Sequence, residues 1–296
     1  MKLSPGERAF EVLNYIVLTV LALIFLIPFL SVVSTSLISS SEFAKRGLFI
    51  LIPRRPVLYA YQLLLGEGSI VLNALKVSLL RVTVGTTMNL LFTFPLAYVL
   101  ARPRLLGRTG LTLFVFFTML FSGGLVPRYV LVEKLSLLDT FWAMILPGLV
   151  NPWWLLIMRN FIMMAIPEEL EEAAIVDGAN PPVIMTRIVF PLSLPSIATI
   201  GLWYAVGHWN AWFDAAIYIF NPKRLPLQPI LRSILEVGVE TLSGASGYST
   251  TDLLAPPPAE AVRTAMIVIC TVPVLFVYPF IQKYFVKGVM IGSIKG

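Results

Sequence analysis

Six long stretches of this chain contain no Asp, Glu, Lys or Arg, and they limit what it can fold into more than any other feature. Each is near or above the roughly 18 apolar residues that a helix needs to cross a bilayer. In lipid every backbone N–H and C=O group must be bonded within its own segment, which favours helices over open strands. The chain is therefore predicted to be an all-α, polytopic membrane protein with six transmembrane helices. The predicted spans are residues 12–41, 82–101, 109–127, 140–158, 188–213 and 264–282.

Composition supports this class independently. Hydrophobic residues make up 57% of the 296 residues and charged residues only 13%, and a soluble domain of this size could not cover so much apolar surface. The first apolar run is too long for a signal-peptide core and lacks a small-residue cleavage site, so we expect an uncleaved signal-anchor. Cys270 is the single cysteine and lies in the last predicted span. It is expected to pack as a small apolar residue, without a disulfide inside the chain.

Positive charges in the loops give little guidance on orientation, because the Lys and Arg counts on the two sides are nearly even. The best local signal is the very short connection that holds Arg102, Arg104 and Arg108. With six spans, both termini and the polar segment around residue 172 are then expected on the same side as these arginines.

A polar segment between the fourth and fifth predicted spans has the signals of two short helices joined by a tight turn. Pro167 suits a first helical position, and the glutamates that follow it favour a helix N-terminus. Gly178 can take the left-handed conformation that closes a helix, and Asn180 can cap the next one, with Pro181 in its first turn. The second helix is expected to end before Pro191.

This segment resembles the cytoplasmic coupling loop of binding-protein-dependent ABC importer permeases, the part of a permease that contacts its ATPase. The alternative is an ordinary surface hairpin between two spans, which would require no particular residue types at these positions. One departure from the family pattern is Met185, where a bulky aromatic residue is common. The resemblance assigns ATPase coupling to Glu172, Ala173, Ala174, Asp177, Gly178, Ala179, Ile188 and Pro191.

The C-terminal region extends the resemblance toward sugar importers. Tyr278-Pro279-Phe280, Gln282 to Phe285, Lys287-Gly288, Gly292-Ser293 and Lys295-Gly296 are similar to the end of carbohydrate importer permeases of the maltose-permease type, in the branch that serves complex oligosaccharides. Ala205 to Asn210 is similar as well.

The resemblance implies a single permease domain over residues 1–296, with the type I importer fold. Within it are a cytoplasmic coupling loop at 166–195, an extracytoplasmic loop at 221–260 and a cytoplasmic tail at 283–296. The implied partners are a second permease subunit, two ATP-binding subunits and an extracytoplasmic solute-binding protein, all at a bacterial inner membrane, with no nucleic acid. The chain contains no Gly-rich loop ending in Gly-Lys-Ser/Thr, so ATP and Mg²⁺ are expected on the partner ATPase, with no catalytic residue, cofactor or metal site in this chain.

Polar and aromatic residues inside the predicted spans are the candidates for a substrate pathway, because polar groups in a bilayer are costly unless they face a cavity or a partner. Arg81, Gly85 and Asn89 share one helical face, and Tyr204, His208 and Trp212 recur at every fourth position. Interfacial anchoring of the tryptophans and helix-to-helix hydrogen bonding by Asn210 are equally open. The candidate pathway residues are Arg81, Asn89, Tyr204, His208, Trp209, Asn210 and Trp212.

An excess of cationic groups near the predicted outward half, Lys76, Arg81 and Arg128 against Asp214, suggests that the cargo carries carboxylates. The guanidinium group of Arg81 can meet a carboxylate through two hydrogen bonds. The competing interpretation is that Arg81 pairs with Asp214, or with an acid of the partner subunit, and only holds helices together.

Three other functions fit the sequence less well. An ABC permease for amino acids or peptides would share the coupling loop but not the C-terminal signature. A secondary transporter would need no coupling motif. A membrane enzyme would need a cluster of catalytic groups that one histidine and scattered acids do not supply.

Overall fold

The computed structural model describes residues 4–47, 49–238 and 257–293, with side chains up to residue 277. Every regular element in these ranges is a helix. The chain divides into two compact units, one made of Met1–Leu72 and Leu231–Pro273, and a second made of Asn73–Ile230 and Val274–Gly296.

The first unit begins with α1 (Pro5–Thr35), a helix of 31 residues. Its start is a capping box, because the Ser4 hydroxyl accepts a hydrogen bond from the Glu7 amide at 3.3 Å and the Glu7 carboxylate accepts one from the Ser4 amide at 2.7 Å. Most of its large apolar side chains are exposed on all sides of the helix. A helix that is apolar all round requires a lipid or protein environment.

The short elements of the first unit are α2 (Ser40–Arg46) and α3 (Tyr59–Leu65). Glu42 is buried and accepts hydrogen bonds from the Arg54 amide at 2.9 Å and from Nη1 of Arg46 at 2.7 Å. These bonds hold the pKa of the Glu42 carboxyl below its ordinary value. The unit also includes the later part of α13 (Leu227–Glu236) and the start of α15 (Ala259–Ser293).

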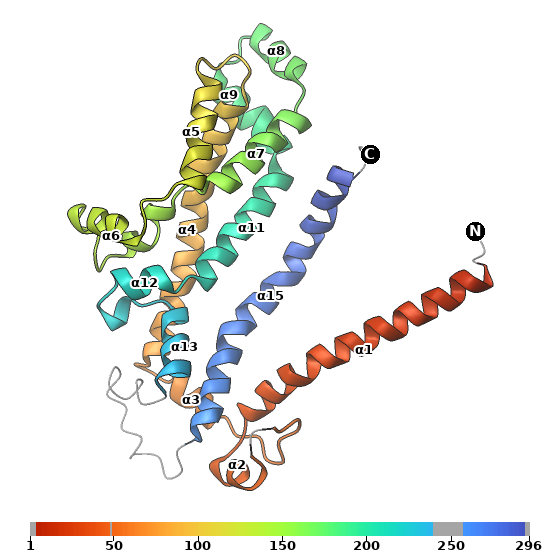
Figure 1. Cartoon of the computed structure of the whole chain (residues 1–296), viewed down its shortest axis with the longest axis vertical. Coiled ribbons are helices and arrows are strands. Elements are labelled where there is room, and N and C mark those ends of the chain that lie inside the picture. The colour runs from red at the N-terminus through yellow and green to blue at the C-terminus, as the bar shows by residue number, and fades with distance from the viewer. Residues whose placement is uncertain (1–3, 48, 239–256, 294–296) are drawn as a thin grey trace. The chain divides into compact units, whose positions relative to one another are not determined.

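The second unit contains the functional candidates. In Figure 1, α4 (Ile70–Ala101), α5 (Arg108–Leu120), α7 (Pro152–Ala165) and α11 (Leu194–Asn210) run alongside one another, and α8 (Glu168–Val176) lies beyond one end of them. The shorter α6 (Leu125–Lys134) and α12 (Phe213–Tyr218) lie toward the other end. The remaining elements are the 3₁₀ helices Phe141–Met144, Leu146–Gly148 and Pro222–Arg224, α9 (Pro181–Ile184), the π-helical Met185–Val189 and α10 (Phe190–Leu192).

The described residues contain three continuous helices long and apolar enough to span a membrane, and six spans if each of three bent helix pairs counts as one. The predicted all-α membrane class is confirmed, and the count of six agrees with the bent pairs. Three of the predicted spans are bent in the structure. The chain turns by 110° between α5 and α6, by 52° between Phe141–Gly148 and α7, and by 80° before α11.

Glycine and proline explain the first two of these breaks. Gly124 has φ +85°, which a residue with a side chain rarely adopts, and it precedes α6. Pro147 and Pro152 flank the second bend, where Asn151 caps α7 by accepting a hydrogen bond from the Trp153 amide at 2.9 Å. The second predicted span starts at residue 82, whereas α4 already begins at Ile70. The predicted span excluded Arg81 because it is charged, but in the structure Arg81 lies within α4 and is buried.

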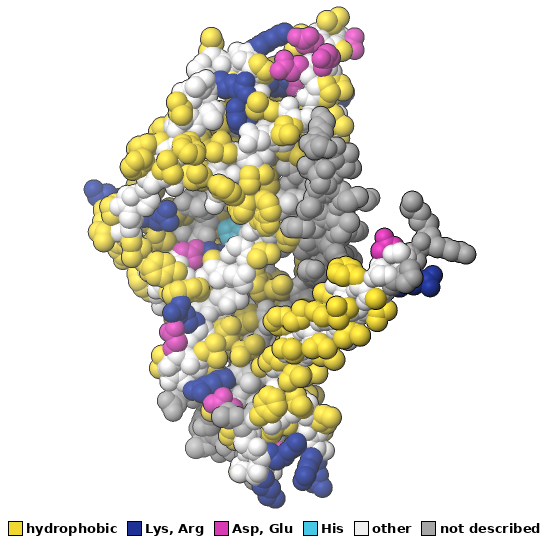
Figure 2. All heavy atoms as spheres, turned by 45° about the vertical axis from the view of Figure 1, so that its right-hand side comes forward, with side chains coloured by type: hydrophobic (Ala, Val, Ile, Leu, Met, Phe, Trp, Pro, Cys, Tyr) yellow, Lys and Arg dark blue, Asp and Glu magenta, His cyan; other side chains and the backbone are white. Residues whose placement is uncertain are grey.

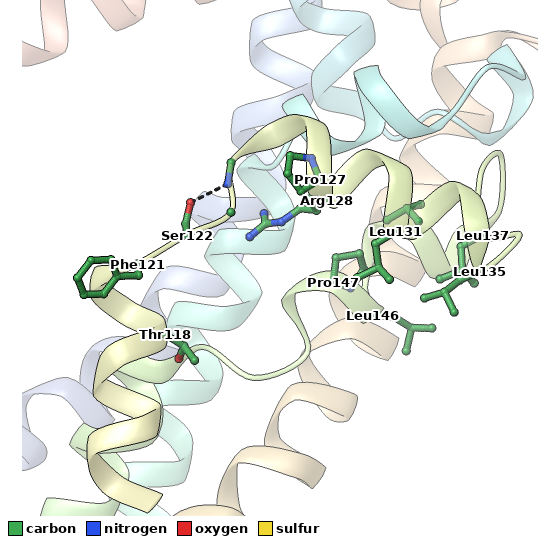
Figure 3. A pocket seen from close by; sticks show the side chains of 13 residues that line it. Thr118, Phe121, Ser122, Pro127, Arg128, Leu131, Leu135, Leu137, Leu146 and Pro147 are labelled. Carbon is green, nitrogen blue, oxygen red and sulfur yellow. Dashed lines mark hydrogen bonds between the residues drawn. The ribbon is translucent and has the colours of Figure 1, made fainter. Parts of the chain in front are cut away.

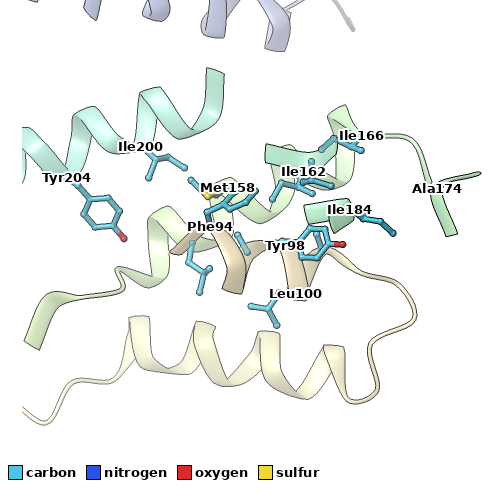
Figure 4. Packing of buried hydrophobic residues seen from close by; sticks show 14 residues of the cluster. Phe94, Tyr98, Leu100, Met158, Ile162, Ile166, Ala174, Ile184, Ile200 and Tyr204 are labelled. Atoms are coloured by element: carbon cyan, nitrogen blue, oxygen red, sulfur yellow. The ribbon is translucent and has the colours of Figure 1, made fainter. Parts of the chain in front are cut away.

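A buried apolar cluster joins the ends of α4, α7, α8, α9 and α11. Figure 4 shows Tyr98 and Leu100 of α4, Ile162 of α7, Ala174 of α8 and Ile184 of α9 in this cluster. The cluster places α8 against the body of the second unit, so α8 is packed on the bundle and is not a free loop.

Candidate functional site

The coupling loop predicted from the sequence has the expected helix–turn–helix form. α8 contains Glu168, Glu169 and Glu171 in its first turn, where the helix dipole favours negative charge. Its N-cap is Pro167, so the prediction that Pro167 occupies the first helical position was wrong by one residue. Proline suits this place too, because its backbone is extended there and no N–H is required.

The turn after α8 is closed by the residues that the sequence indicated. Gly178 has φ +81°, and the Ala179 amide donates to the Ala174 carbonyl at 2.9 Å, which closes the end of the helix. The Asn180 side chain accepts a hydrogen bond from the Val183 amide at 3.1 Å and caps α9.

The second helix of the loop does not end before Pro191. It continues through the π-helical segment Met185–Val189 and through α10, which contains Pro191 in its first turn. Pro191 has no backbone N–H to donate, and it follows a π-helical segment in which the regular i to i−4 bonding is already interrupted. The chain breaks instead at Ser193, ahead of α11. Ile188 is half-buried against the apolar cluster.

The two alanines of the Glu-Ala-Ala sequence face different surroundings. Ala174 is buried in the apolar cluster, whereas Ala173 is exposed. Leu170 and Val176 are exposed as well, at 45% and 87% of their surface. Leu170, Ala173 and Val176 therefore form an apolar strip within the exposed part of α8, which also includes Ile175 and the glutamates Glu168, Glu169 and Glu172. Asp177 is exposed beside this strip. Of the two alanines that the resemblance assigns to ATPase coupling, only Ala173 lies on the exposed side of α8.

Two arginines after α4 are joined to α8 by ion pairs. Arg102 pairs with Glu171, and Nη2 of Arg104 donates to Oε1 of Glu172 at 2.6 Å. The Arg102 guanidinium also lies 3.9 Å from the centre of the Tyr98 ring. Burial lowers the pKa of Arg102 from its ordinary value, but an arginine remains charged at neutral pH. Sequence reasoning used these arginines only for orientation, since nothing local in the sequence indicates pairs 68 or 69 residues apart.

Charges gather at this end of the unit. Figure 2 shows basic and acidic side chains together around α8, with apolar side chains covering most of the surface between the ends of the helices. Such a surface fits a segment outside the bilayer that continues into spans inside it.

The predicted polar face of α4 meets α11 and the chain before α7. Asn89 is fully buried, and its Nδ2 donates to the carbonyls of Gly148 at 3.1 Å and Leu149 at 2.7 Å. Nε2 of His208 donates to Oδ1 of Asn89 at 2.6 Å. A Cβ atom at Gly85 would lie 2.5 Å from His208 Nε2, so the glycine makes room for the ring.

Tyr204 meets the same face of α4, one turn before His208 in α11. Its hydroxyl shares a hydrogen bond of 3.0 Å with Thr93 and accepts one from the Asn151 amide at 3.0 Å. Trp209 is buried. Asn210 is exposed, and Trp212 is half-buried with its ring 5.3 Å from that of Phe213 in an edge-on arrangement. The structure thus brings Asn89, Tyr204 and His208 together between α4 and α11, while Asn210 and Trp212 lie at the end of α11.

Arg81 is 2% exposed and forms an ion pair with Asp214 of α12. Its guanidinium also donates to the carbonyls of Met144 at 3.2 Å and Ala211 at 3.3 Å. Both terminal nitrogens of the guanidinium group already donate to these acceptors, and only its Nε is left without a partner. The geometry therefore favours the interpretation in which Arg81 holds helices together.

A cavity of about 420 Å³ lies beside this ion pair. Its lining includes Arg81, Arg128, His208 and Asp214, and its other walls are largely apolar. A second cavity of about 510 Å³, between the α5–α6 connection and Leu146-Pro147, shares Arg128 as a lining residue. Figure 3 shows the second cavity. Among the described residues no group of three or more His, Cys, Asp or Glu side chains is placed to hold a metal ion.

Comparisons with known proteins agree with this geometry. The family model described as "binding-protein-dependent transport system inner membrane component" matches residues 68–291. Protein LplC of Bacillus subtilis is 42% identical over 99% of this chain and 97% of its own length. The polygalacturonan/rhamnogalacturonan transport system permease protein YtcP of the same organism is 42% identical over 98% of this chain and 99% of its own. Among solved structures, a bacterial ABC transporter involved in the import of the acidic polysaccharide alginate matches with a TM-score of 0.85 and 31% identity, over 96% of this chain and 99% of the matched chain.

Proposed function

This chain belongs to the family of inner membrane components of binding-protein-dependent transport systems, and on that premise we propose that it is a permease subunit of an ABC importer for oligosaccharides. It is a multi-pass membrane protein of a multi-component transporter. The support for sugar as cargo comes from relatives, which include the permeases named for polygalacturonan/rhamnogalacturonan and for arabinooligosaccharides.

The single observation that carries the mechanism is how α8 packs: one side contacts the helix bundle and the other side is exposed. Its exposed strip of Leu170, Ala173 and Val176 is small and apolar, and it is bounded by Asp177 and the positive-φ turn at Gly178. Such a strip suits insertion into a cleft of an ATPase subunit. Behind it, Ala174 and the ion pairs of Arg102 and Arg104 transmit movement of α8 to the end of α4.

The transport cycle then follows from a two-state bundle. When two ATP-binding subunits close on ATP, their clefts pull the coupling helices of this chain and of a second permease subunit together. The helix bundles change between inward-open and outward-open states, since a ligand can shift such an equilibrium by its differential affinity for the two states. ATP and Mg²⁺ act on the ATPase subunits, and a solute-binding protein delivers the sugar from outside. This chain gates transport and forms or breaks no bond in the cargo.

We further assign the cargo to acidic oligosaccharides. Two similar proteins are named for acidic polymers: the polygalacturonan/rhamnogalacturonan permease, and the transporter involved in the import of alginate. Both are similar over nearly the whole of this chain. This cargo class also agrees with the second arginine in the lining of the 420 Å³ cavity.

The coupling assignment is tested on the complete complex, purified through a tag on this chain. Ala173→Trp places a large side chain on the exposed strip, and Gly178→Val forces a β-branched residue into φ +81° beside it. Both variants are expected to insert in the membrane but to lose at least about tenfold of the ATP hydrolysis that the binding protein stimulates.

Gly68→Val is the matched control, because Gly68 has φ +79° and a Cβ atom placed there would meet nothing within 4 Å. It lies just before the start of α4, away from the coupling loop in sequence. This control is expected to keep stimulated hydrolysis. If Ala173→Trp and Gly178→Val hydrolyse ATP at the normal stimulated rate in an intact complex, α8 is not the coupling element.

A further inference from the structure

The 420 Å³ cavity carries a charge that its own lining does not neutralise. Arg81 and Asp214 cancel each other in their ion pair, and His208 is engaged by Asn89. Arg128 is exposed and has no hydrogen bond or ion pair with another described residue. The lining that the structure describes therefore presents one cation without a counter-charge.

The bend between α5 and α6 puts this cation at the cavity. The 110° turn at Ser122 to Gly124 redirects the chain, and Arg128 follows in the second turn of α6. In Figure 3 the Arg128 side chain extends back toward the segment that holds Ser122, away from the leucines at the other end of the cavity. Arg128 lines both this cavity and its 510 Å³ neighbour, so it stands where the two spaces meet.

The rest of the lining suits a sugar ring. Phe213 and Tyr218 supply aromatic surface, and Ser122 supplies a hydroxyl group. The volume lies within the range of about 300–1,000 Å³ typical of small-molecule sites. The walls also include the apolar side chains of Leu125, Ile145 and Ile217.

We propose that Arg128 binds a carboxylate group of the cargo sugar in this cavity and thereby selects acidic over neutral oligosaccharides. The inference rests on the proposed importer function and names a residue that determines its specificity. An arginine suits the role because its planar guanidinium group can donate two parallel hydrogen bonds to one carboxylate. The competing role for an exposed arginine beside a span is to reach the phosphate groups of lipids, where a lysine serves as well.

The test measures uptake by cells that contain the complete importer, with trigalacturonate and trimannuronate as acidic probes and galactotriose and mannotriose as neutral ones. Arg128→Gln is expected to raise the KM for the transported acidic probe by at least about tenfold, with the KM for neutral probes unchanged. Arg128→Lys is expected to leave the amount of complex in the membrane at the wild-type level. Its KM for the acidic probe is still expected to show most of the increase seen in Arg128→Gln. Lys134→Gln removes a charge from the same helix outside both cavities and is expected to behave as wild type.

Several results would overturn the inference. Arg128→Gln with normal acidic uptake, or with equal loss for acidic and neutral probes, removes Arg128 as a specificity residue. If Arg128→Gln lowers the amount of complex in the membrane, and Arg128→Lys restores both that amount and uptake fully, then Arg128 contacts lipid and does not bind the cargo. If the wild-type importer takes up only the neutral probes, the acidic selectivity is contradicted but the importer function is not. If the wild-type importer takes up none of the probes, the oligosaccharide function itself is contradicted.

Discussion

The ion pair between Arg81 and Asp214 should respond unequally to the loss of its two partners. Asp214→Asn leaves the Arg81 guanidinium buried, at 2% exposure, without a counter-charge. Removing one partner of a buried pair costs about 3–5 kcal/mol. The carbonyls of Met144 and Ala211 still accept hydrogen bonds from Arg81 in the variant. We therefore expect the free energy of unfolding to fall by about 3 kcal/mol, the lower end of that range.

Arg81→Gln should lower the free energy of unfolding by less, because the group that it leaves unpaired, the Asp214 carboxylate, is more accessible to water. The Asp214 side chain is 31% exposed and can be hydrated in place. The main loss is the charged hydrogen bonding of the guanidinium group, for which we expect about 2 kcal/mol. The double variant removes both charges, and its cost should fall short of the sum of the single costs by about 1–2 kcal/mol.

The assay is equilibrium unfolding of the purified chain in mixed detergent micelles, followed by the fluorescence of its 6 tryptophans. Glu236→Gln is a control, because its ion pair with Arg232 is exposed and should contribute under about 1 kcal/mol. Equal costs for Asp214→Asn and Arg81→Gln, combined with strict additivity in the double variant, would refute the reasoning from burial.

Two further predictions concern a close contact and a carboxylate. Gly85→Ala should lower the unfolding midpoint at a cost of about 1–3 kcal/mol, since its Cβ atom would lie 2.5 Å from the half-buried His208 ring. Gly207→Ala, with nothing within 4 Å, should have a smaller effect, and equal midpoints for both variants would contradict the contact. The Asn221 amide donates a hydrogen bond to the Asp139 carboxylate at 2.9 Å, and this bond contributes most to holding the pKa of that carboxyl below its ordinary value. The ionised carboxylate therefore stabilises the fold above about pH 4. This contribution is lost as the pH falls through the lowered pKa. In a pH series of unfolding midpoints, Asp139→Asn should therefore be less stable than wild type at pH 7 and approach it below pH 4, and a gap that stays constant across the series would show that the carboxylate charge is not involved.

The sequence by itself determined the features that depend on neighbours a few residues apart. The apolar runs indicated membrane helices because their length and lack of charge leave no other way to satisfy the backbone in lipid. Gly178 and Asn180 indicated the turn of the coupling loop because a left-handed residue and a side-chain cap act on amides within four positions. The resemblance of that loop to importer permeases rested on the same short-range pattern.

Only the tertiary structure decided which side of each helix is covered and where each charge finds its partner. Ala173 and Ala174 are the same residue type in adjacent positions, and packing in the cluster that holds Ile184 is what buries one of them and leaves the other exposed. Arg81 looked like a cargo ligand or a structural residue with equal reason until α12 placed Asp214 beside it, 133 positions along the chain. Such long-range choices depend on the summed packing of several helices, which periodicity within one helix does not encode.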